Sequence, residues 1–307
     1  MSLDTFIPQL WGDTLLVALR NVLVYGNIVN RDWEGQIRQM GDTVRIHGIG
    51  QVTISNYVKD NDINAPQSLT DAETMLVISQ AKYYNFEVDD VDAAQQHPKV
   101  MTEAMSYAAY QIANTIDSYI AGFYTDTPSG SSVGSSGAFT TPTAPTQANV
   151  GAGTTVYDYL STLDQYLSQN NVPYEGRWCV VPPWVTTYLN MDIRFTSFNT
   201  AQANERLAQT IRGADGGNRP GYVGHIANMD VYQSVNAPHL GGTAGVAGSQ
   251  DVVLAGHGMA ITFADGINKV EAYRPPYRFA DAVKGLCLYG AKTVRPQALA
   301  AAYLQHP

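Results

Sequence analysis

The sequence predicts an α+β fold. Two runs of alternating apolar and polar residues, at 42–58 and 74–88, are typical of β-strands. A single apolar stripe at helical spacing follows over 98–123, and the rest of the chain mixes helical and strand patterns without an internal repeat. A helix and a hairpin followed by a long helix and then a mixed α/β region is an order typical of α+β proteins.

The composition predicts a folded protein whose surface is covered in part by other chains. The 307 residues are 45% hydrophobic, which is incompatible with wholesale disorder. Charged residues make up 15%, against about 25% in ordinary soluble domains. The chain also contains 19 tyrosines. Tyrosine suits protein–protein contacts because it combines a large contact area with one polar group.

The charge balance and the cysteine content exclude several classes of protein. The net charge is -9 and the pI is about 5.0, so the basic surface of a dedicated nucleic-acid-binding protein is absent. The most apolar stretch, 15–25, is interrupted by Arg20 and is too short to span a bilayer, so we expect no membrane association. A secretory signal starts with basic residues, and none precedes Arg20 in this sequence. Cys179 and Cys287 are the only cysteines. These features predict a chain made in a reducing cytosol.

Residues 1–40 are predicted to form an arm. One short apolar stripe at helical spacing runs through it, formed by Leu15, Leu19, Val22 and Leu23. So short a helix cannot stay folded alone, so we expect it to lie on another surface.

The two strand runs predict a long β-hairpin. The second run, from Thr74 to Val88, is the expected antiparallel partner of 42–58, and a polar, turn-rich segment at 59–66 separates them. A lone hairpin is marginally stable in water, so this element too should rest on something else.

The strongest helical pattern covers 98–123. Pro98 suits the first turn of a helix and Gly122 suits its end. The apolar stripe contains Met101, Met105, Ala108, Ile112, Ile116 and Ile120, flanked by Ala104, Ala109 and Ala113. At 1.5 Å per residue such a helix is nearly 40 Å long and would act as a structural beam.

The remainder predicts a mixed region. Residues 126–153 are rich in Gly, Ser, Thr and Pro, which is typical of a flexible loop. A helix at 154–170, a buried strand at 177–181 and a helix from Trp184 to Leu189 follow, and 196–220 is polar. Short strands are expected at 222–235, 251–255, 259–263 and 268–274, with a last pair near 284–294.

Patterns that could carry chemistry each have a simpler structural explanation. Ser132 lies in a G-x-S-x-G pattern, but inside low-complexity sequence without a strand before it. Residues 60–71 resemble a calcium loop, but the sixth place is Ala65, the seventh is Pro66 and the twelfth is Asp71 instead of Glu.

The remaining ionisable residues show no catalytic or metal-ligand spacing. Carboxylates crowd before the long helix, where its dipole stabilises them: Glu87, Asp89, Asp90 and Asp92. His225, His239 and His257 are scattered, and both cysteines lie in apolar surroundings that predict buried, inert thiols. We therefore expect no enzyme activity, no metal and no cofactor.

In the order of its parts the chain resembles a tailed-bacteriophage major capsid (coat) protein, closest to the podophage coat-like group. Local patterns match along nearly the whole chain: 41–46 at the start of the extended loop, 180–189 as the first axial strand and helix, 221–238 as a glycine, strand, serine and proline stretch, and 295–299 as the C-terminal strand.

The resemblance implies the phage major capsid fold, with an N-terminal arm, an extended β-hairpin loop, a long spine helix and an axial α/β domain. The implied divisions are an arm at 1–40, an extended loop at 41–95, a peripheral domain at 96–139, an axial domain at 140–265 and return strands of the peripheral domain at 266–307.

The resemblance also implies a function and partners. The chain would self-assemble, as hexamers and pentamers, into an icosahedral head shell around double-stranded DNA held without sequence specificity. A separate scaffolding protein is implied because no long charged segment precedes the arm, and a portal protein and a possible decoration protein complete the partners. The protein would be assembled in the host cytoplasm and reside in the virion. Two alternatives remain open, an encapsulin-like compartment holding a cargo enzyme and a hydrolase using Ser132.

Seven residues are candidates for contacts between subunits, chosen from the two elements that cannot be stable alone. They are Leu15 and Leu19 in the arm, and Lys59, Asp60, Asp62, Tyr83 and Tyr84 in the hairpin. Some family members cross-link covalently through a lysine of the extended loop. Nothing marks Lys59 or Lys82 as activated, so we do not expect that chemistry here.

Overall fold

The structure is a computed structural model, and it describes residues 24–32, 43–49, 54–57, 59, 62, 65, 71–89, 99–145, 153–195 and 221–307. In these ranges the α+β prediction is confirmed, because helices pack on two separate β-sheets. The predicted helix of the arm and the polar stretch 196–220 lie outside the described residues.

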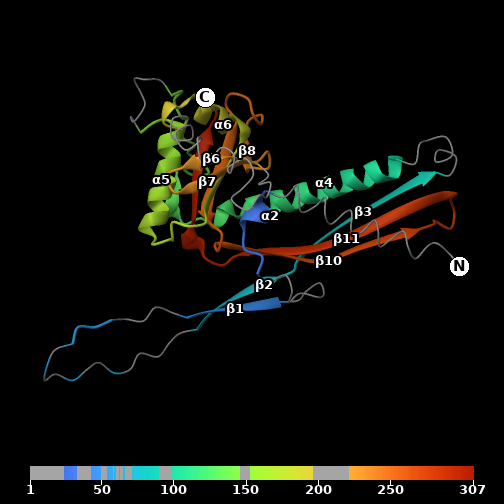
Figure 1. Cartoon of the computed structure of the whole chain (residues 1–307), viewed down its shortest axis with the longest axis horizontal. Helices are drawn as coiled ribbons and strands as arrows, with labels where there is room; N and C mark the ends of the chain where they lie inside the picture. The colour runs from blue at the N-terminus through green and yellow to red at the C-terminus, as the bar shows by residue number, and fades with distance from the viewer. Residues whose placement is uncertain are drawn as a thin grey trace, which may run out of the picture.

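A three-stranded antiparallel sheet forms one half of the body. Its strands lie in the order β10 (Ile261–Tyr273), β11 (Ala280–Thr293) and β3 (Gln80–Asp89). The long helix α4 (Lys99–Ala121) runs along this sheet, and two short 3₁₀ helices follow it, at Gly122–Asp126 and Ser129–Ser131 (Figure 1).

A seven-stranded mixed sheet forms the other half. Its strands are β4 (Ser132–Val133), β12 (Leu299–Gln305), β9 (Gln250–His257), β5 (Arg177–Val181), β7 (Met229–Gln233) and β6 (Tyr222–Ile226), in that order, with β8 (His239–Gly241) also paired to β9. Helix α5 (Val156–Gln169) packs against β12, and helix α6 (Pro183–Met191) packs against α5.

Helix α4 confirms the predicted beam. Its buried apolar residues form one stripe along the helix, namely Met105, Ala109, Ile112, Ala113, Ile116, Ile120 and Ala121. The first two contact Val283 of the three-stranded sheet, while the isoleucines enter the large core shared with the seven-stranded sheet. One helix face therefore holds both sheets. The predicted start at Pro98 lies just outside the described residues.

The two helices and the buried strand predicted for 154–189, where the sequence has a regular hydrophobic pattern, are confirmed. Helix α5 begins with a capping box, in which Thr155 Oγ1 accepts the N–H of Asp158 while Asp158 Oδ2 accepts the N–H of Thr155. All five residues of β5 are buried, as predicted. Four of them are apolar, and the charged first residue, Arg177, is paired with Asp164 of α5. Helix α6 has a proline in its first turn.

The prediction of one continuous hairpin is wrong. Strand β1 (Thr43–Ile49) pairs only with β2 (Asp71–Val77), whereas 80–89 leaves the hairpin and pairs with β11. The chain crosses at Ile78, which is buried, and passes very close to Gly290. A Cβ atom at Gly290 would lie 2.5 Å from the carbonyl oxygen of Val77. Residues 54–57 have no regular structure, so the first strand is also shorter than expected.

The prediction of a flexible loop over 126–153 is wrong for its first half. Strand β4 pairs in parallel with β12, and Thr140 exchanges backbone hydrogen bonds with Tyr303 and Gln305. This segment satisfies the edge of β12, whose N–H and C=O groups would otherwise lack partners.

Three further strand predictions need correction. The runs at 259–263 and 268–274 form one strand, β10, with a register shift between Asp265 and Asn268. The expected pair near 284–294 is the single strand β11. Strand β12 was indicated only by the family resemblance at 295–299, because its sequence is rich in alanine.

The α4 stripe makes a direct prediction about stability. Ile116→Ala should lower the free energy of unfolding by about 2–5 kcal/mol, because Ile116 is fully buried and its truncation leaves a cavity. Thr115→Ala, one position away on the exposed face, is the matched control and should change stability by less than about 0.5 kcal/mol. Denaturant unfolding of the two variants measures the difference, and equal values would show that the stripe does not hold the core.

Candidate intersubunit surfaces

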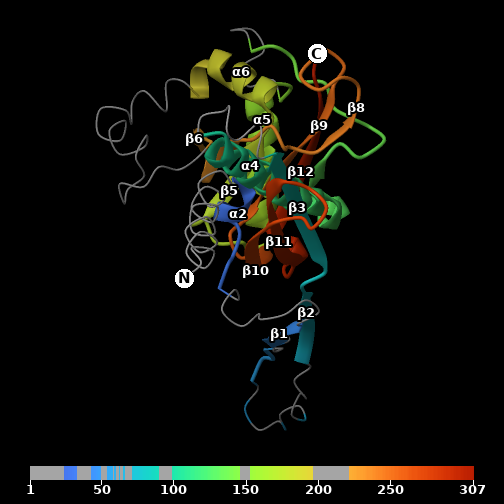
Figure 2. The ribbon, with the colours of Figure 1, turned by 90° about the vertical axis from the view of Figure 1, so that its right-hand side faces the viewer.

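The β1–β2 hairpin projects away from the body (Figures 1 and 2). Its anchor is a small cluster consisting of Val44, Leu76, Ile78, Ala264 and Leu288. The other face of β2 leaves Met75 and Val77 exposed, with relative exposures of 47% and 40%. Farther along the hairpin, Ile54 and Tyr57 are also exposed. The hairpin thus presents apolar side chains that its own subunit does not cover.

The predicted contact residues of the arm and hairpin are only partly described. Lys59 and Asp62 are exposed, in the part of the hairpin beyond β1 and β2. Leu15, Leu19 and Asp60 lie outside the described residues, as does most of the calcium-like segment. For this group a role in subunit contacts stays a prediction.

Tyr83 and Tyr84 differ in their surroundings. Tyr83 has a relative exposure of 81%. Tyr84 is half-buried beside Phe86, with ring centroids 6.1 Å apart, and lies directly over Gly285, where a Cβ atom would be 2.2 Å from its ring. Burial raises the pKa of Tyr84 to about 12. Tyr84 therefore belongs to the packing of its own subunit, because side chains alternate between the two faces of a strand, and Tyr83 remains the contact candidate.

A groove of about 380 Å³ lies beside Tyr83 on the three-stranded sheet, bordered by Leu286, Asn85 and three charged residues. Glu271 accepts hydrogen bonds from Lys269 at 2.5 Å and Lys284 at 3.0 Å, and these lysines lower its pKa to about 2. The groove therefore combines an exposed apolar rim with an exposed network of ion pairs.

The turn between β10 and β11 exposes two aromatic side chains, Tyr277 at 96% and Phe279 at 81%. Between them, Arg278 forms an ion pair with Glu87 of β3. The sequence placed Glu87 at the start of the long helix, where the helix dipole would stabilise it. Its partner is instead a guanidinium from the neighbouring sheet connection.

The N-terminal side of the described chain is fixed to α4 by one carboxylate. Helix α2 (Tyr25–Ile28) starts beside Asp117, whose Oδ2 accepts the backbone N–H of Val24 at 3.1 Å. Tyr25 is fully buried against the same core. Burial raises the pKa of Asp117 to about 6, although backbone hydrogen bonds act in the opposite direction.

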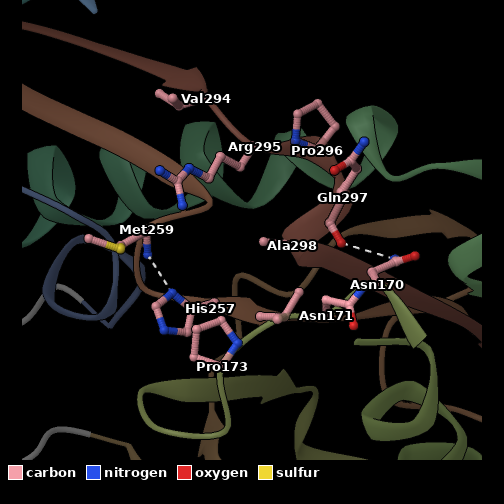
Figure 3. Close-up of a pocket in the computed structure, with 11 residues that line it drawn as sticks. Asn170, Asn171, Pro173, His257, Met259, Val294, Arg295, Pro296, Gln297 and Ala298 are labelled. Atoms are coloured by element: carbon pink, nitrogen blue, oxygen red, sulfur yellow. Dashed lines mark hydrogen bonds between the residues drawn. The ribbon is translucent and has the colours of Figure 1, made fainter. Parts of the chain in front are cut away.

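A pocket of about 450 Å³ opens where three connections meet: 170–173 after α5, the β9–β10 turn, and 294–298 between β11 and β12 (Figure 3). The amide of Asn170 donates to the carbonyl of Gln297 at 3.0 Å, and His257 Nδ1 accepts the N–H of Met259 at 3.1 Å. No carboxylate is among the described residues that line the pocket, so His257 lacks the partner of an acid–base pair.

The enzymatic alternatives gain no support from the described geometry. Ser132 lies in β4 and donates to the carbonyl of Ser129, whereas a nucleophile of this motif occupies a strand-to-helix turn. Cys179 and Cys287 are buried, as predicted, and burial raises the pKa of both thiols. Within the described ranges, no cluster of His, Cys, Asp or Glu could hold a metal ion, and no helix is long and apolar enough to cross a membrane.

The fold and its exposed surfaces agree with the comparisons to known proteins. The family model described as phage capsid protein matches residues 72–302. This chain belongs to the phage capsid protein family. Its role is structural, that of a major capsid protein, and a search of curated protein sequences gave no significant match.

Solved structures from phages and from a virus-like particle share this fold over nearly their whole length. A chain from Mycobacterium phage Che8 is 25% identical, with a TM-score of 0.64, and the match covers 91% of this capsid protein and 90% of that chain. A chain from the capsid of cyanophage P-SCSP1u is 18% identical, with a TM-score of 0.60 and coverages of 91% and 87%. A virus-like particle from Pyrococcus furiosus is 9% identical, with a TM-score of 0.55 and coverages of 94% and 96%, a likeness of fold alone.

Sequence reasoning missed two of these features. The groove beside Tyr83 depends on the register of β3, β11 and β10, which brings residues far apart in the chain together. The Asp117 contact depends on a tertiary fold that buries a polar position of the helix. Asp117 is the only charged residue in the C-terminal half of α4, and that signal could have drawn attention to it.

Two carboxylates of the capsid protein should respond to pH in opposite directions. Because the pKa of Asp117 is raised from 3.8, its ionisation opposes folding, and this cost appears as the pH rises from about 4 to about 6. Over that pH range the free energy of unfolding of the wild type should fall by on the order of 3 kcal/mol relative to that of Asp117→Asn.

Asp158 is the matched control. Burial raises its pKa, but hydrogen bonds from Arg194 and Thr155 lower it more, so the net shift is downward. Its contribution is present above the pKa of the unfolded chain and is lost as the pH falls. The loss of stability in Asp158→Asn should therefore grow as the pH rises. Unfolding curves at several pH values give the stability difference between the wild type and each variant. With rising pH this difference should change in opposite directions for Asp117→Asn and Asp158→Asn, and a change in the same direction would contradict these assignments.

Proposed function

We propose that this capsid protein assembles with copies of itself, as pentamers and hexamers, into an icosahedral head shell that encloses double-stranded DNA. The observation that carries the proposal is the β1–β2 hairpin. It extends from the body on a five-residue anchor and exposes Met75 and Val77, so a neighbouring subunit is its natural support. The exposed aromatic residues at 277 and 279 provide a second apolar contact surface.

The charge of the chain fits a container. A net charge of -9 gives little general attraction for phosphate, so packaged DNA would be neither bound tightly nor held back during ejection. In this proposal a separate scaffolding protein guides assembly in the host cytoplasm, a portal protein occupies one vertex, and a decoration protein is an optional partner. The chain has no catalytic role in it.

The proposed division of labour follows the domain boundaries predicted from sequence. The arm at 1–40, up to helix α2, and the extended loop at 41–95, up to β3, would reach neighbouring subunits. The peripheral parts at 96–139 and 266–307 would form the rigid span, and β12 within the second of them also completes the seven-stranded sheet. The axial domain at 140–265 would pack around the symmetry axes. The position near the podophage coat-like group stays a prediction.

A compartment shell with an enzyme cargo is the alternative. The likeness to the Pyrococcus furiosus particle supports a common fold, while the family match favours a phage capsid. Electron microscopy of the purified full-length chain distinguishes a phage capsid from a compartment shell. Hollow shells are expected, shells filled with a co-purifying enzyme would favour the compartment, and small particles alone would contradict both.

Two changes to the hairpin test its role in assembly. A chain lacking residues 58–70, and a Met75→Asp/Val77→Asp chain, should fold with an unchanged melting temperature yet give few or no shells. Met75→Leu/Val77→Ile keeps the apolar area and is the matched control, so it should assemble like the wild type. Sedimentation and negative-stain counting measure the yield, and normal shells from both altered chains would overturn the proposal.

A further inference from the structure

His239, at the start of β8, lies between two hydrogen-bond acceptors. Its Nδ1 is 2.8 Å from Oδ1 of Asp251, and its Nε2 is 3.2 Å from the carbonyl oxygen of Gly242. A carboxylate and a carbonyl offer no hydrogen, and a neutral imidazole has only one N–H. Both contacts are satisfied only when the ring carries a proton on each nitrogen.

The side chain of Asp251 is held in place by two other donors. Its side chain has a relative exposure of 6%, and Oδ2 accepts the indole N–H of Trp184 at 2.7 Å together with the hydroxyl of Ser249. These two donors fix the carboxylate from β9 toward β8, so Oδ1 remains available to the imidazolium.

The surroundings contain few other titratable groups. Helix α6 has no charged residue and contributes the phenol of Tyr188 beside Trp184. From the end of β12, the ring of His306 packs on Trp184 with centroids 4.8 Å apart. Strand β9 carries His257 at its far end, and the segment 240–249 has no charged side chain. Asp251 is therefore the one charged side chain that faces His239 from these described elements.

The contact closes a glycine-rich loop that has two internal backbone hydrogen bonds: the N–H of Val246 donates to the carbonyl of Thr243 at 3.1 Å, and the N–H of Ser249 donates to the carbonyl of Val246 at 2.9 Å. Residues 241–248, which start at the last residue of β8, have the sequence Gly-Gly-Thr-Ala-Gly-Val-Ala-Gly. Three of these glycines, at 242, 245 and 248, have φ values of +78°, +75° and +87°. At its other end the loop is tied by the N–H of Gly248, which donates to the carbonyl of His306 at 2.8 Å. Because glycine leaves the open loop many conformations, these few contacts decide its order.

We propose that His239 and Asp251 form a proton-dependent latch that keeps the glycine-rich loop at 241–248 closed while His239 is charged and releases it when the ring loses a proton. The hydrogen bond with Asp251 raises the pKa of His239 above 6.5, and the carbonyl of Gly242 acts in the same direction. A raised pKa means that the stabilisation is complete below about pH 6.5 and is lost as the pH rises through the pKa of the closed state.

The latch is a property of the folded chain and goes beyond the proposed shell function. Its consequence concerns Val246, which is exposed at the tip of the loop, and Leu240, which is exposed on β8. Both side chains would be held in fixed positions below the transition and would become mobile above it. The loop lies near the C-terminal end of the chain and α6 in Figure 1.

Hydrogen exchange of the full-length chain tests the latch. Amide protection of a peptide covering 240–250 is measured at about pH 6 and about pH 8.5, with rates corrected for the intrinsic effect of pH. Protection should fall by about tenfold for each unit by which closure raises the pKa of His239. His239→Gln should show low protection at both pH values.

The control is His225→Gln. This ring also faces a carboxylate, with Nδ1 3.0 Å from Oδ1 of Asp230, but it lies on β6, which is three strands away from β9 in the same sheet. The pH response of the loop should stay intact in this variant. Equal loop protection at both pH values in the wild type, or a response that survives in His239→Gln, would overturn the latch.

A direct titration covers the case in which His239→Gln does not fold. Nitrogen-detected NMR of the wild-type chain reports the protonation of each imidazole nitrogen. Two protonated nitrogens and a pKa above about 6.5 are expected for His239. A single protonated nitrogen near neutral pH, or a pKa at or below that of an ordinary histidine, would overturn the proposal.

Discussion

The structure depends on the burial of one face of α4. The stripe from Met105 to Ile120 is continuous, yet no single sheet covers it. Its first part packs on the three-stranded sheet and its second part enters the core that includes β5, β9 and β12. Bending this helix would be costly, so α4, which is about 35 Å long, holds the two sheets in a fixed relative position.

The segments that do not pack on α4 bury little apolar area within their own subunit. The β1–β2 hairpin is anchored by a cluster of five buried residues, whereas the main core contains dozens. The turn at 274–279 places two aromatic residues in solvent. A rigid body with poorly supported, apolar extensions is incomplete as a monomer. It is suited to a shell, in which each subunit supplies the surface that another one lacks.

The sequence predicted the elements that depend on local periodicity. The stripe of α4, the helical pattern at 154–170 and the apolar residues 178–181 of β5 each predicted the correct element, because each element buries its own apolar residues. The passage of the chain at Ile78 was not predictable in this way. The strand pattern continues through it, and the change of partner is determined by the close approach to Gly290.

Contacts that depend on strand pairing could not be predicted from local sequence patterns either. Alternation along β3 shows that Tyr83 and Tyr84 face opposite ways, but only the position of Gly285 in the paired strand decides which one is buried. The contact of His239 with Asp251 joins residues twelve apart through a strand pairing that the glycine-rich sequence between them does not reveal. Low complexity at 126–153 likewise concealed an edge strand, because its hydrogen bonds are made by the backbone.

We propose above that a neighbouring subunit covers the apolar face of the β1–β2 hairpin. Hydrogen exchange of 71–77, compared between dissociated subunits and assembled particles, tests it most directly, with 109–120 of α4 as the internal reference. We expect strong protection of α4 in both states, whereas 71–77 should exchange rapidly in free subunits and slowly in particles. Equal protection of 71–77 in both states would contradict it.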